Sequence, residues 1–564
     1  MKYDTNQRMS VLIYAILSML PYLIGILIIA PFQDVFYGGD DWAYAWSVLN
    51  LVESSIFEAS DWATAQAVPQ ILWGALFVKI FGWSISVLNI STIVASFFAG
   101  LAFFYMVVAL GFRKNTALLA TIVITVSPIY LGMSLSFMTD SMFTSLILIT
   151  SACYVRAILN KSILFAILGG LFCGAALLER QFGIVLLIAY VFTSLFWYFT
   201  SEEFQSKKDI FKIAALGVAL PILMFIVSLI YPDIIGGKTI AQAYVIDTTE
   251  AFMRLLDIPK LLIKSLITYD YLIVLLCPMF IPFLFSEREK LQYLLDNRWL
   301  LAFISLTLIA GPMVWYVSFG VGVQGDVFQV NSKYGNNEIW SEQIWMGLLL
   351  LCTIPGTLLV AKIWQLVQPL FNTSALAVIV KKTNSNSSAI AMMFIALCTV
   401  GLIILTSSHL SFYNNYFLPI LPFLAICILF ILRDRNQHIL VSSVMVLAFF
   451  ITSVLYTEST VRYVEASWKE ADSLVLSGET ATTIFPWPAW YGWQNTNEVH
   501  EYMRRKVDER SFPMNVIGQA YDDAQIYIIG STDHPLYNES ISRSVPYDTL
   551  IRSRELWVLQ KDYE

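Results

Sequence analysis

Apolar runs about as long as a membrane is thick recur along most of this 564-residue chain. A helix of about 20 apolar residues crosses a hydrocarbon core of about 30 Å, and a helix satisfies its own backbone hydrogen bonds in lipid. Hydrophobic residues make up 57% of the chain and charged residues only 13%, where soluble proteins carry about 25% charged residues. The sequence therefore predicts an all-α polytopic membrane protein.

The hydropathy pattern predicts about thirteen transmembrane helices. They lie near residues 10–30, 84–110, 115–131, 141–159, 162–178, 183–200, 210–230, 272–286, 299–319, 343–363, 389–407, 416–432 and 439–456. Residues 70–81 (QILWGALFVKIF) are apolar but short, and they contain Lys79. If this segment does not cross, every Lys/Arg cluster falls on one side of the membrane, as the positive-inside rule favours. We therefore expect a juxtamembrane helix there, with the N-terminus cytoplasmic and the C-terminus outside.

The tail differs in composition from the rest of the chain, which predicts two domains: a transmembrane domain at 1–456 and an extracytoplasmic domain at 457–564. Thr457–Leu476 should extend the last helix, and residues 497–510 have a helical period. Residues 525–529 (QIYII) and 556–559 (LWVL) are typical of short strands. We expect a small α/β domain. The net charge of −7 argues against a nucleic-acid partner.

Two adjacent carboxylates, Asp40 and Asp41, lie in the first outer loop (residues 32–83) within YGGDDWAYAW. The preceding glycines allow a tight turn, and the surrounding aromatic side chains favour the membrane interface. A carboxylate beside apolar rings has its pKa raised by desolvation, and a second carboxylate raises it further. Such a group suits a general base. The alternative is an ordinary solvated acidic loop.

Ionisable residues also stand at the outer ends of two later spans. Asp140 begins a span, where it serves either as a helix cap or in a functional site. Glu179, Arg180 and Gln181 interrupt an apolar stretch, either as a turn with a local ion pair or as a functional group. An arginine at this depth can bind a phosphate at the level of the lipid headgroups.

Further basic residues and one histidine lie in other outer segments. Lys260 and Lys264 are four residues apart, and they form either a basic stripe that faces lipid phosphate or part of a snorkelling interfacial helix. His409 is a lone histidine near a helix end, and such a residue is more often packed than a ligand. The chain lacks a Walker loop, a GxSxG motif and an HExxH motif.

The ordered set of motifs resembles the GT-C class of membrane glycosyltransferases, in the branch of protein O-mannosyltransferases and the lipid A aminoarabinose transferase. The resemblance is carried by Asp40-Asp41-Trp42-Ala43, by the juxtamembrane segment AVPQILWGALFVKIFG, by Thr139-Asp140 and by the late LPILPFL. Two departures stand out. Asn415-Tyr416 occupies the place of an Arg-Tyr pair, and Ala67-Val68 replaces a histidine before Pro69.

The resemblance implies a hexosyl- or pentosyltransferase that moves one sugar from a polyprenyl phosphate to an acceptor hydroxyl outside the membrane, with inversion. Asp40 would be the general base, and Asp41 would orient the acceptor or tune the pKa of Asp40. Asp140 would hold hydroxyl groups, and Arg180 with Lys260 or Lys264 would receive the phosphate charge. The remaining expected substrate contacts are Glu179, Gln181, His409 and Tyr413.

The resemblance implies no cofactor, although Asp40 and Asp140 sharing a divalent cation is an alternative. The expected partners are the lipid-linked donor, membrane lipids and a lipid, polysaccharide or protein acceptor. Short inner loops favour the plasma membrane of a bacterium. A transporter or flippase of lipid-linked saccharide and an inactive scaffold remain the rival functions.

Overall fold

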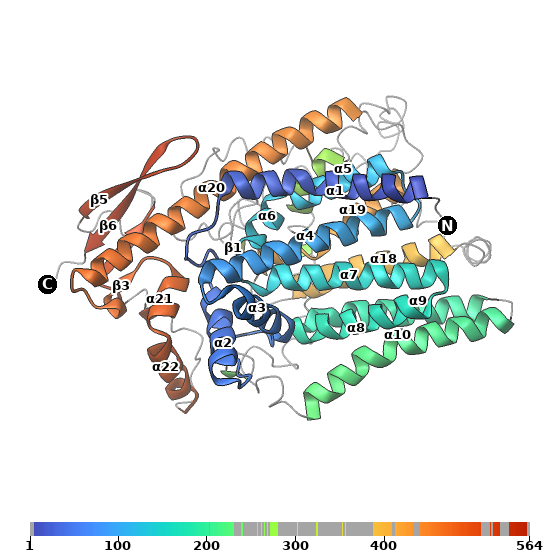
Figure 1. Ribbon diagram of the computed structural model, residues 1–564, viewed down its shortest axis with the longest axis horizontal. Helices are drawn as coiled ribbons and strands as arrows, with labels where there is room; N and C mark the ends of the chain where they lie inside the picture. Colours follow the sequence, from blue (N-terminus) through green and yellow to red (C-terminus); the bar gives the residue numbers. More distant parts are fainter. Residues whose placement is uncertain are drawn as a thin grey trace.

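The computed structural model describes residues 5–201, 204–230, 271–279, 387–408, 412–432, 439–508, 523–530 and 541–560, with a few single or paired residues between them. Most of these residues are helical, and the long helices run side by side in Figure 1. Within the described residues, seven helices are long and apolar enough to cross a membrane, or eight if one bent pair forms a single span. The chain is therefore a multi-pass membrane protein.

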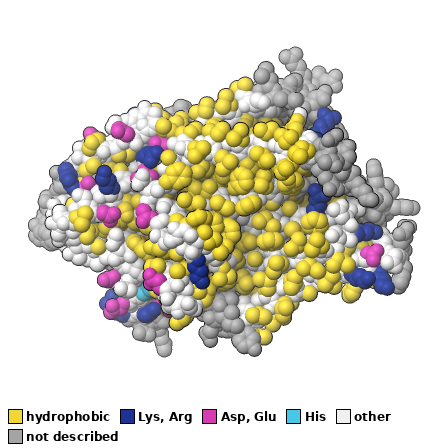
Figure 2. Space-filling view, viewed as in Figure 1, with side chains coloured by type: hydrophobic (Ala, Val, Ile, Leu, Met, Phe, Trp, Pro, Cys, Tyr) yellow, Lys and Arg dark blue, Asp and Glu magenta, His cyan; other side chains and the backbone are white. Residues whose placement is uncertain are grey.

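Seven long apolar helices lie within the described residues. They are α1 (Thr5–Ile29), α4 (Ile85–Ala109), α7 (Thr139–Asn160), α9 (Ile184–Thr200), α10 (Phe204–Ile230), α18 (Ser387–Ser408) and α20 (Ile439–Leu476). The shorter α8 (Ile163–Glu179) packs between α7 and α10, and α7 also packs on α4. Hydrophobic side chains cover this helical middle in Figure 2, and charged side chains gather at its two ends. This distribution fits a protein embedded in a bilayer.

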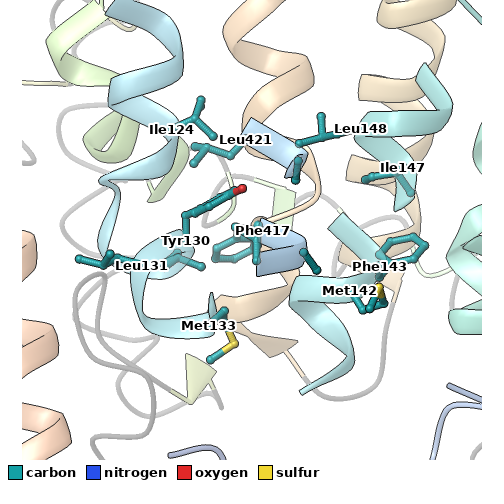
Figure 3. Close-up of a cluster of buried hydrophobic side chains, with 14 of the residues drawn as sticks. Ile124, Tyr130, Leu131, Met133, Met142, Phe143, Ile147, Leu148, Phe417 and Leu421 are labelled. Atoms are coloured by element: carbon teal, nitrogen blue, oxygen red, sulfur yellow. The ribbon is translucent and has the colours of Figure 1, made fainter. Parts of the chain in front are cut away.

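The span expected near 115–131 is broken into two helices. Helix α5 (Lys114–Thr125) and helix α6 (Pro128–Ser134) meet at 63°. Pro128 cannot donate a backbone hydrogen bond, and it disfavours helical geometry at the residue before it, so Ser127 is extended and caps α6 instead. Figure 3 shows Tyr130, Leu131 and Met133 of α6 packed in a buried apolar cluster with side chains of α7 and α19.

Other expected spans differ in length or fall outside the description. Helix α19 (Ile420–Ile431) has 12 residues, because Pro419 and a short 3-10 turn over 414–417 precede it. The span near 272–286 is helical over the described residues 271–279, and the spans near 299–319 and 343–363 lie almost entirely outside the described residues. The total of thirteen spans therefore stays a prediction.

Two short helices fold the first loop. Helix α2 (Asp41–Ser54) begins at the second aspartate, and helix α3 (Val68–Phe81) confirms the helix expected at 70–81. At about 1.5 Å per residue, the 14 residues of α3 are too short to cross the hydrocarbon core. Helix α3 packs on α2, α4 and α8, so the loop forms a folded layer over the ends of the long helices.

The tail forms a small α/β unit, as the sequence predicted. Helix α20 continues to Leu476, and α21 (Pro488–Gln494) and α22 (Thr496–Asp508) follow it. The strands are β3 (Ile484–Phe485), β4 (Ile526–Ile529), β5 (Ile541–Asp548) and β6 (Ser553–Gln560), in the order β3-β4-β6-β5. Strands β3 and β4 are parallel, and the other pairs are antiparallel. A separate short pair joins β1 (Val323–Gln324) to β2 (Phe412–Tyr413).

Candidate active site

The two adjacent aspartates have different environments because the chain turns sharply before them. Asp41 is fully buried, and its two carboxylate oxygens accept hydrogen bonds from the Gly38 amide (2.9 Å) and the Ser136 hydroxyl (2.8 Å). A Cβ at Gly38 would overlap Asp41, Ser136 and Met138, whereas Gly39 faces open space. Burial raises the pKa of Asp41 to about 7, and the Gly38 and Ser136 hydrogen bonds oppose this rise. Asp41 therefore holds the turn together.

Asp40 is half-buried at the start of α2. The indole N–H of Trp62 donates a hydrogen bond of 2.8 Å to one of its carboxylate oxygens. Burial raises the pKa of Asp40 above its ordinary value, and the Trp62 hydrogen bond opposes this by stabilising the charged form. The charge of Asp140 raises this pKa further and the charge of Arg180 lowers it, so the three groups lie within electrostatic reach of one another.

Arg180 and Asp140 form a bidentate ion pair between the end of α8 and the start of α7. The two terminal guanidinium nitrogens of Arg180 each donate to a different carboxylate oxygen of Asp140 at 2.9 Å, and Nε donates to Thr139 at 2.7 Å. The Asp140 side chain has no exposed surface, while 16% of the Arg180 side chain is exposed. Two of the five guanidinium N–H groups are not used in these bonds. Arg180 therefore presents positive charge beside Asp40, over the ring of Tyr416.

Glu179 lies next to this pair in sequence but points elsewhere. Its side chain is fully buried, and one carboxylate oxygen accepts the backbone N–H of Gln70 at 3.1 Å. Gln70 is in the first turn of α3, so the Glu179 carboxyl accepts one of the backbone N–H groups that have no partner within that helix. In this conformation Glu179 supports the loop and does not reach an open surface. Gln181, two residues later, is exposed.

Four other expected site residues lie outside this cluster or outside the described side chains. Lys260 and His409 lie outside the described residues. Tyr413 is in β2, but its side chain lies outside the description. Lys264 is helical and half-buried, and its carbonyl oxygen accepts a hydrogen bond from Thr268. The convergence observed here therefore involves Asp40, Asp41, Asp140 and Arg180.

Within the described residues, no group of three or more His, Cys, Asp or Glu side chains could hold a metal ion. Both carboxylate oxygens of Asp140 are engaged by Arg180. The alternative of a divalent cation shared by Asp40 and Asp140 stays a hypothesis, and a chelator titration tests it.

The tail also contacts the turn that carries the two aspartates, which no pattern in the sequence predicts. The indole N–H of Trp487 donates to the carbonyl oxygen of Gly38 at 3.1 Å, and Gly492 of α21 lies against the ring of Trp42. Tyr37 donates to Glu465 of α20 at 2.9 Å. The turn that carries the two aspartates is thus held from the tail side as well as by Ser136, in the segment between α6 and α7.

Helix α22 forms the second contact between the tail and the first loop. His500 Nε2 lies 2.8 Å from the Ser60 hydroxyl, and Arg504 pairs with Asp61 at 2.9 Å. Both partners immediately precede Trp62, the residue that binds Asp40. The only signal for this contact in the sequence is the amphipathic period of residues 497–510, which shows a packed face but not its partner.

Comparison with known proteins agrees with the motifs noted in the sequence. Residues 59–234 match the family described as dolichyl-phosphate-mannose-protein mannosyltransferase. The predicted resemblance to GT-C class membrane glycosyltransferases is confirmed. The matched segment contains Trp62, Asp140 and Arg180 of the candidate site, while Asp40 lies before its first residue. No curated protein matches the chain.

Solved structures show distant likenesses to this GT-C-like chain. The apo oligosaccharyltransferase of Archaeoglobus fulgidus aligns with 12% identity and a TM-score of 0.46, covering 100% of this chain and 75% of that one. ArnT from Cupriavidus metallidurans, bound to undecaprenyl phosphate, aligns with 10% identity and a TM-score of 0.41, covering 97% of each chain. These identities and TM-scores are low, so the proposals below take no argument from these two structures.

Proposed function

We propose that this protein transfers a sugar from a polyprenyl-phosphate-linked donor to an acceptor hydroxyl at the outer face of the membrane. The observation that supports this most directly is that the aspartate turn meets the start of α7: Ser136 binds Asp41, and Thr139 and Asp140, three and four residues later, bind Arg180. The charged side chains come from α2, α7 and the end of α8, and a structural ion pair alone would not need a half-buried carboxylate beside it. The match of residues 59–234 to a family of lipid-phosphate-dependent mannosyltransferases points to the same donor chemistry.

The proposed reaction is a direct displacement. The acceptor oxygen attacks the anomeric carbon and gives its proton to Asp40, while the bond from that carbon to the phosphate oxygen breaks. The electron pair leaves with the phosphate, so the leaving group needs positive charge rather than a proton donor. The Arg180 guanidinium, on a side chain that is 16% exposed, supplies that charge. A single displacement inverts the anomeric configuration.

The neighbouring residues have supporting roles in this proposal. Asp140 and Thr139 fix the orientation of Arg180, and Asp41 fixes the turn that presents Asp40. Gln181 is placed to contact the substrate because it is exposed beside Arg180. Lys264, with Lys260, would add positive charge for the donor phosphate. His409 and Tyr413 stay proposed substrate contacts, and Glu179 acts through α3.

The cellular setting is part of the same proposal. We place the N-terminus in the cytoplasm and the tail outside a bacterial plasma membrane, because basic loops then stay on the inner side. Residues 457–564 would form an outer domain that is continuous with the last transmembrane helix through α20. The acceptor would be a lipid, a polysaccharide or a protein.

Replacing Asp40 with Asn tests the base directly. Sugar transfer from a radiolabelled polyprenyl-phosphate donor should fall by about 100-fold or more in membranes that contain folded protein. Asp34→Asn is the matched control, because Asp34 is an exposed acid of the same loop that accepts only a hydrogen bond from Ser86 in the description. Undiminished transfer by Asp40→Asn removes Asp40 from the base role. Movement of intact donor across the bilayer, without transfer, favours the transporter instead.

A further inference from the structure

The turn between β5 and β6 exposes two adjacent large aliphatic side chains. Leu550 is 55% exposed and Ile551 is 53% exposed. The turn is closed by Thr549, whose backbone N–H and hydroxyl both donate to the Arg552 carbonyl oxygen at 3.1 and 2.8 Å. The two side chains are therefore held at the end of a short, well-defined hairpin rather than on a loose loop.

The depth of this turn is fixed by its contact with α20. The backbone N–H of Leu550 donates to the Glu458 carboxylate at 3.2 Å. One turn farther along α20, Arg462 donates to the carbonyl oxygen of Ile29, the last residue of α1, at 3.0 Å. At about 1.5 Å per residue, Glu458 lies about 6 Å from Arg462 toward the transmembrane part of α20. The hairpin turn is thus level with the end of the first span.

The orientation of the hairpin agrees with this depth. Figure 1 shows the turn that joins β5 and β6 beside α20, at the end of the hairpin nearer the transmembrane helices. Arg552 follows the aliphatic pair directly and is exposed. Apolar side chains flanked by a cation form the pattern of a segment that dips into a bilayer surface, where the cation reaches the lipid phosphates.

We propose that the β5–β6 turn inserts Leu550 and Ile551 into the leaflet on the side of the first loop, with Arg552 at the headgroups of phospholipids. The tail then contacts the membrane at a second place besides α20. The contact steadies the sheet that is paired to α20 through Arg543 and Glu470. This inference depends on the depth of the turn in the membrane and not on the transfer reaction.

Site-specific fluorescence in lipid nanodiscs tests the insertion with the full chain. Leu550→Cys and Ile551→Cys are labelled with an environment-sensitive dye, and lipids with a nitroxide near the headgroup serve as quenchers. Leu476→Cys is the matched control, because Leu476 is an 89% exposed aliphatic residue on α20, about 27 Å farther along the helix than Glu458. The six native cysteines are buried or half-buried. The wild-type chain, treated with the same dye, measures how much label they take up.

We expect the dye at positions 550 and 551 to emit at shorter wavelength than at position 476 and to be quenched by the nitroxide lipid. Quenching by aqueous iodide at positions 550 and 551 as strong as at 476, with no quenching by the lipid, overturns the proposal. Because both side chains are exposed, these substitutions should not prevent folding.

Discussion

The indole N–H of Trp62 donates a hydrogen bond of 2.8 Å to Asp40, between two residues that lie 22 positions apart in the first loop. This bond joins the proposed base to the part of the loop that α22 holds through Ser60 and Asp61. The orientation and the pKa of Asp40 therefore depend on a contact that the tail reinforces.

Trp62→Phe should move the acidic limb of the pH profile of sugar transfer to higher pH. The ring is retained, but the hydrogen bond that stabilises the charged form of Asp40 is lost, so the pKa of Asp40 rises further above its ordinary value. Trp73→Phe is the control, because that indole donates to the Ser91 carbonyl oxygen and not to an acidic side chain. An unchanged pH profile in Trp62→Phe, with full folding, contradicts a tuning role.

Gly38→Ala and Gly39→Ala should differ sharply although the residues are adjacent. A Cβ at position 38 overlaps Asp41, Ser136 and Met138, and one at position 39 meets no atom within 4 Å. Overpacking of this kind costs about 1–3 kcal/mol in the free energy of unfolding. Thermal unfolding in detergent should show a lower midpoint for Gly38→Ala only. Equal midpoints for the two variants mean that the turn relaxes freely.

A double-mutant cycle on Arg180 and Asp140 separates structure from catalysis. Arg180→Gln leaves the buried Asp140 charge without its partner, which costs about 3–5 kcal/mol. Adding Asp140→Asn removes that charge, so the double variant should recover much of the lost thermal stability. Sugar transfer should stay low, because the positive charge for the leaving phosphate is still missing. Recovery of transfer together with stability assigns the pair a structural role alone.

Lowering the pH should loosen α22 from the first loop. Burial lowers the pKa of His500 below its ordinary value of 6.5, while Asp61 and Glu58 oppose this and Arg504 supports it. His500 therefore binds a proton more readily when α22 is released than when it is packed. As pH falls below about 6.5, the free energy needed to release α22 from the first loop decreases. Hydrogen exchange of residues 496–508 should be faster at about pH 5.5 than at about pH 7.5, after correction for intrinsic rates. His500→Gln should lose this dependence, and equal protection of the wild type at both pH values contradicts it.

Sequence patterns predicted the secondary structure correctly where neighbouring residues alone determine it. Long apolar runs predicted helices such as α4 and α7, and the short apolar runs QIYII and LWVL predicted β4 and β6. The juxtamembrane helix α3 was found from its length and from charge bias. The break at Ser127–Pro128 was missed, although the proline is visible, because hydropathy averages over the kink that a proline introduces.

The sequence by itself determined that this is a helical membrane protein with acids and an arginine at the ends of its helices, because hydrophobicity and charge act over a few neighbouring residues. Only the tertiary structure decided which of these groups meet. It paired Arg180 with Asp140, turned Glu179 toward α3, and brought Trp62 and the tail to the aspartate turn. Contacts between residues hundreds of positions apart depend on how whole elements pack, and a periodic pattern marks a packed face without naming its partner.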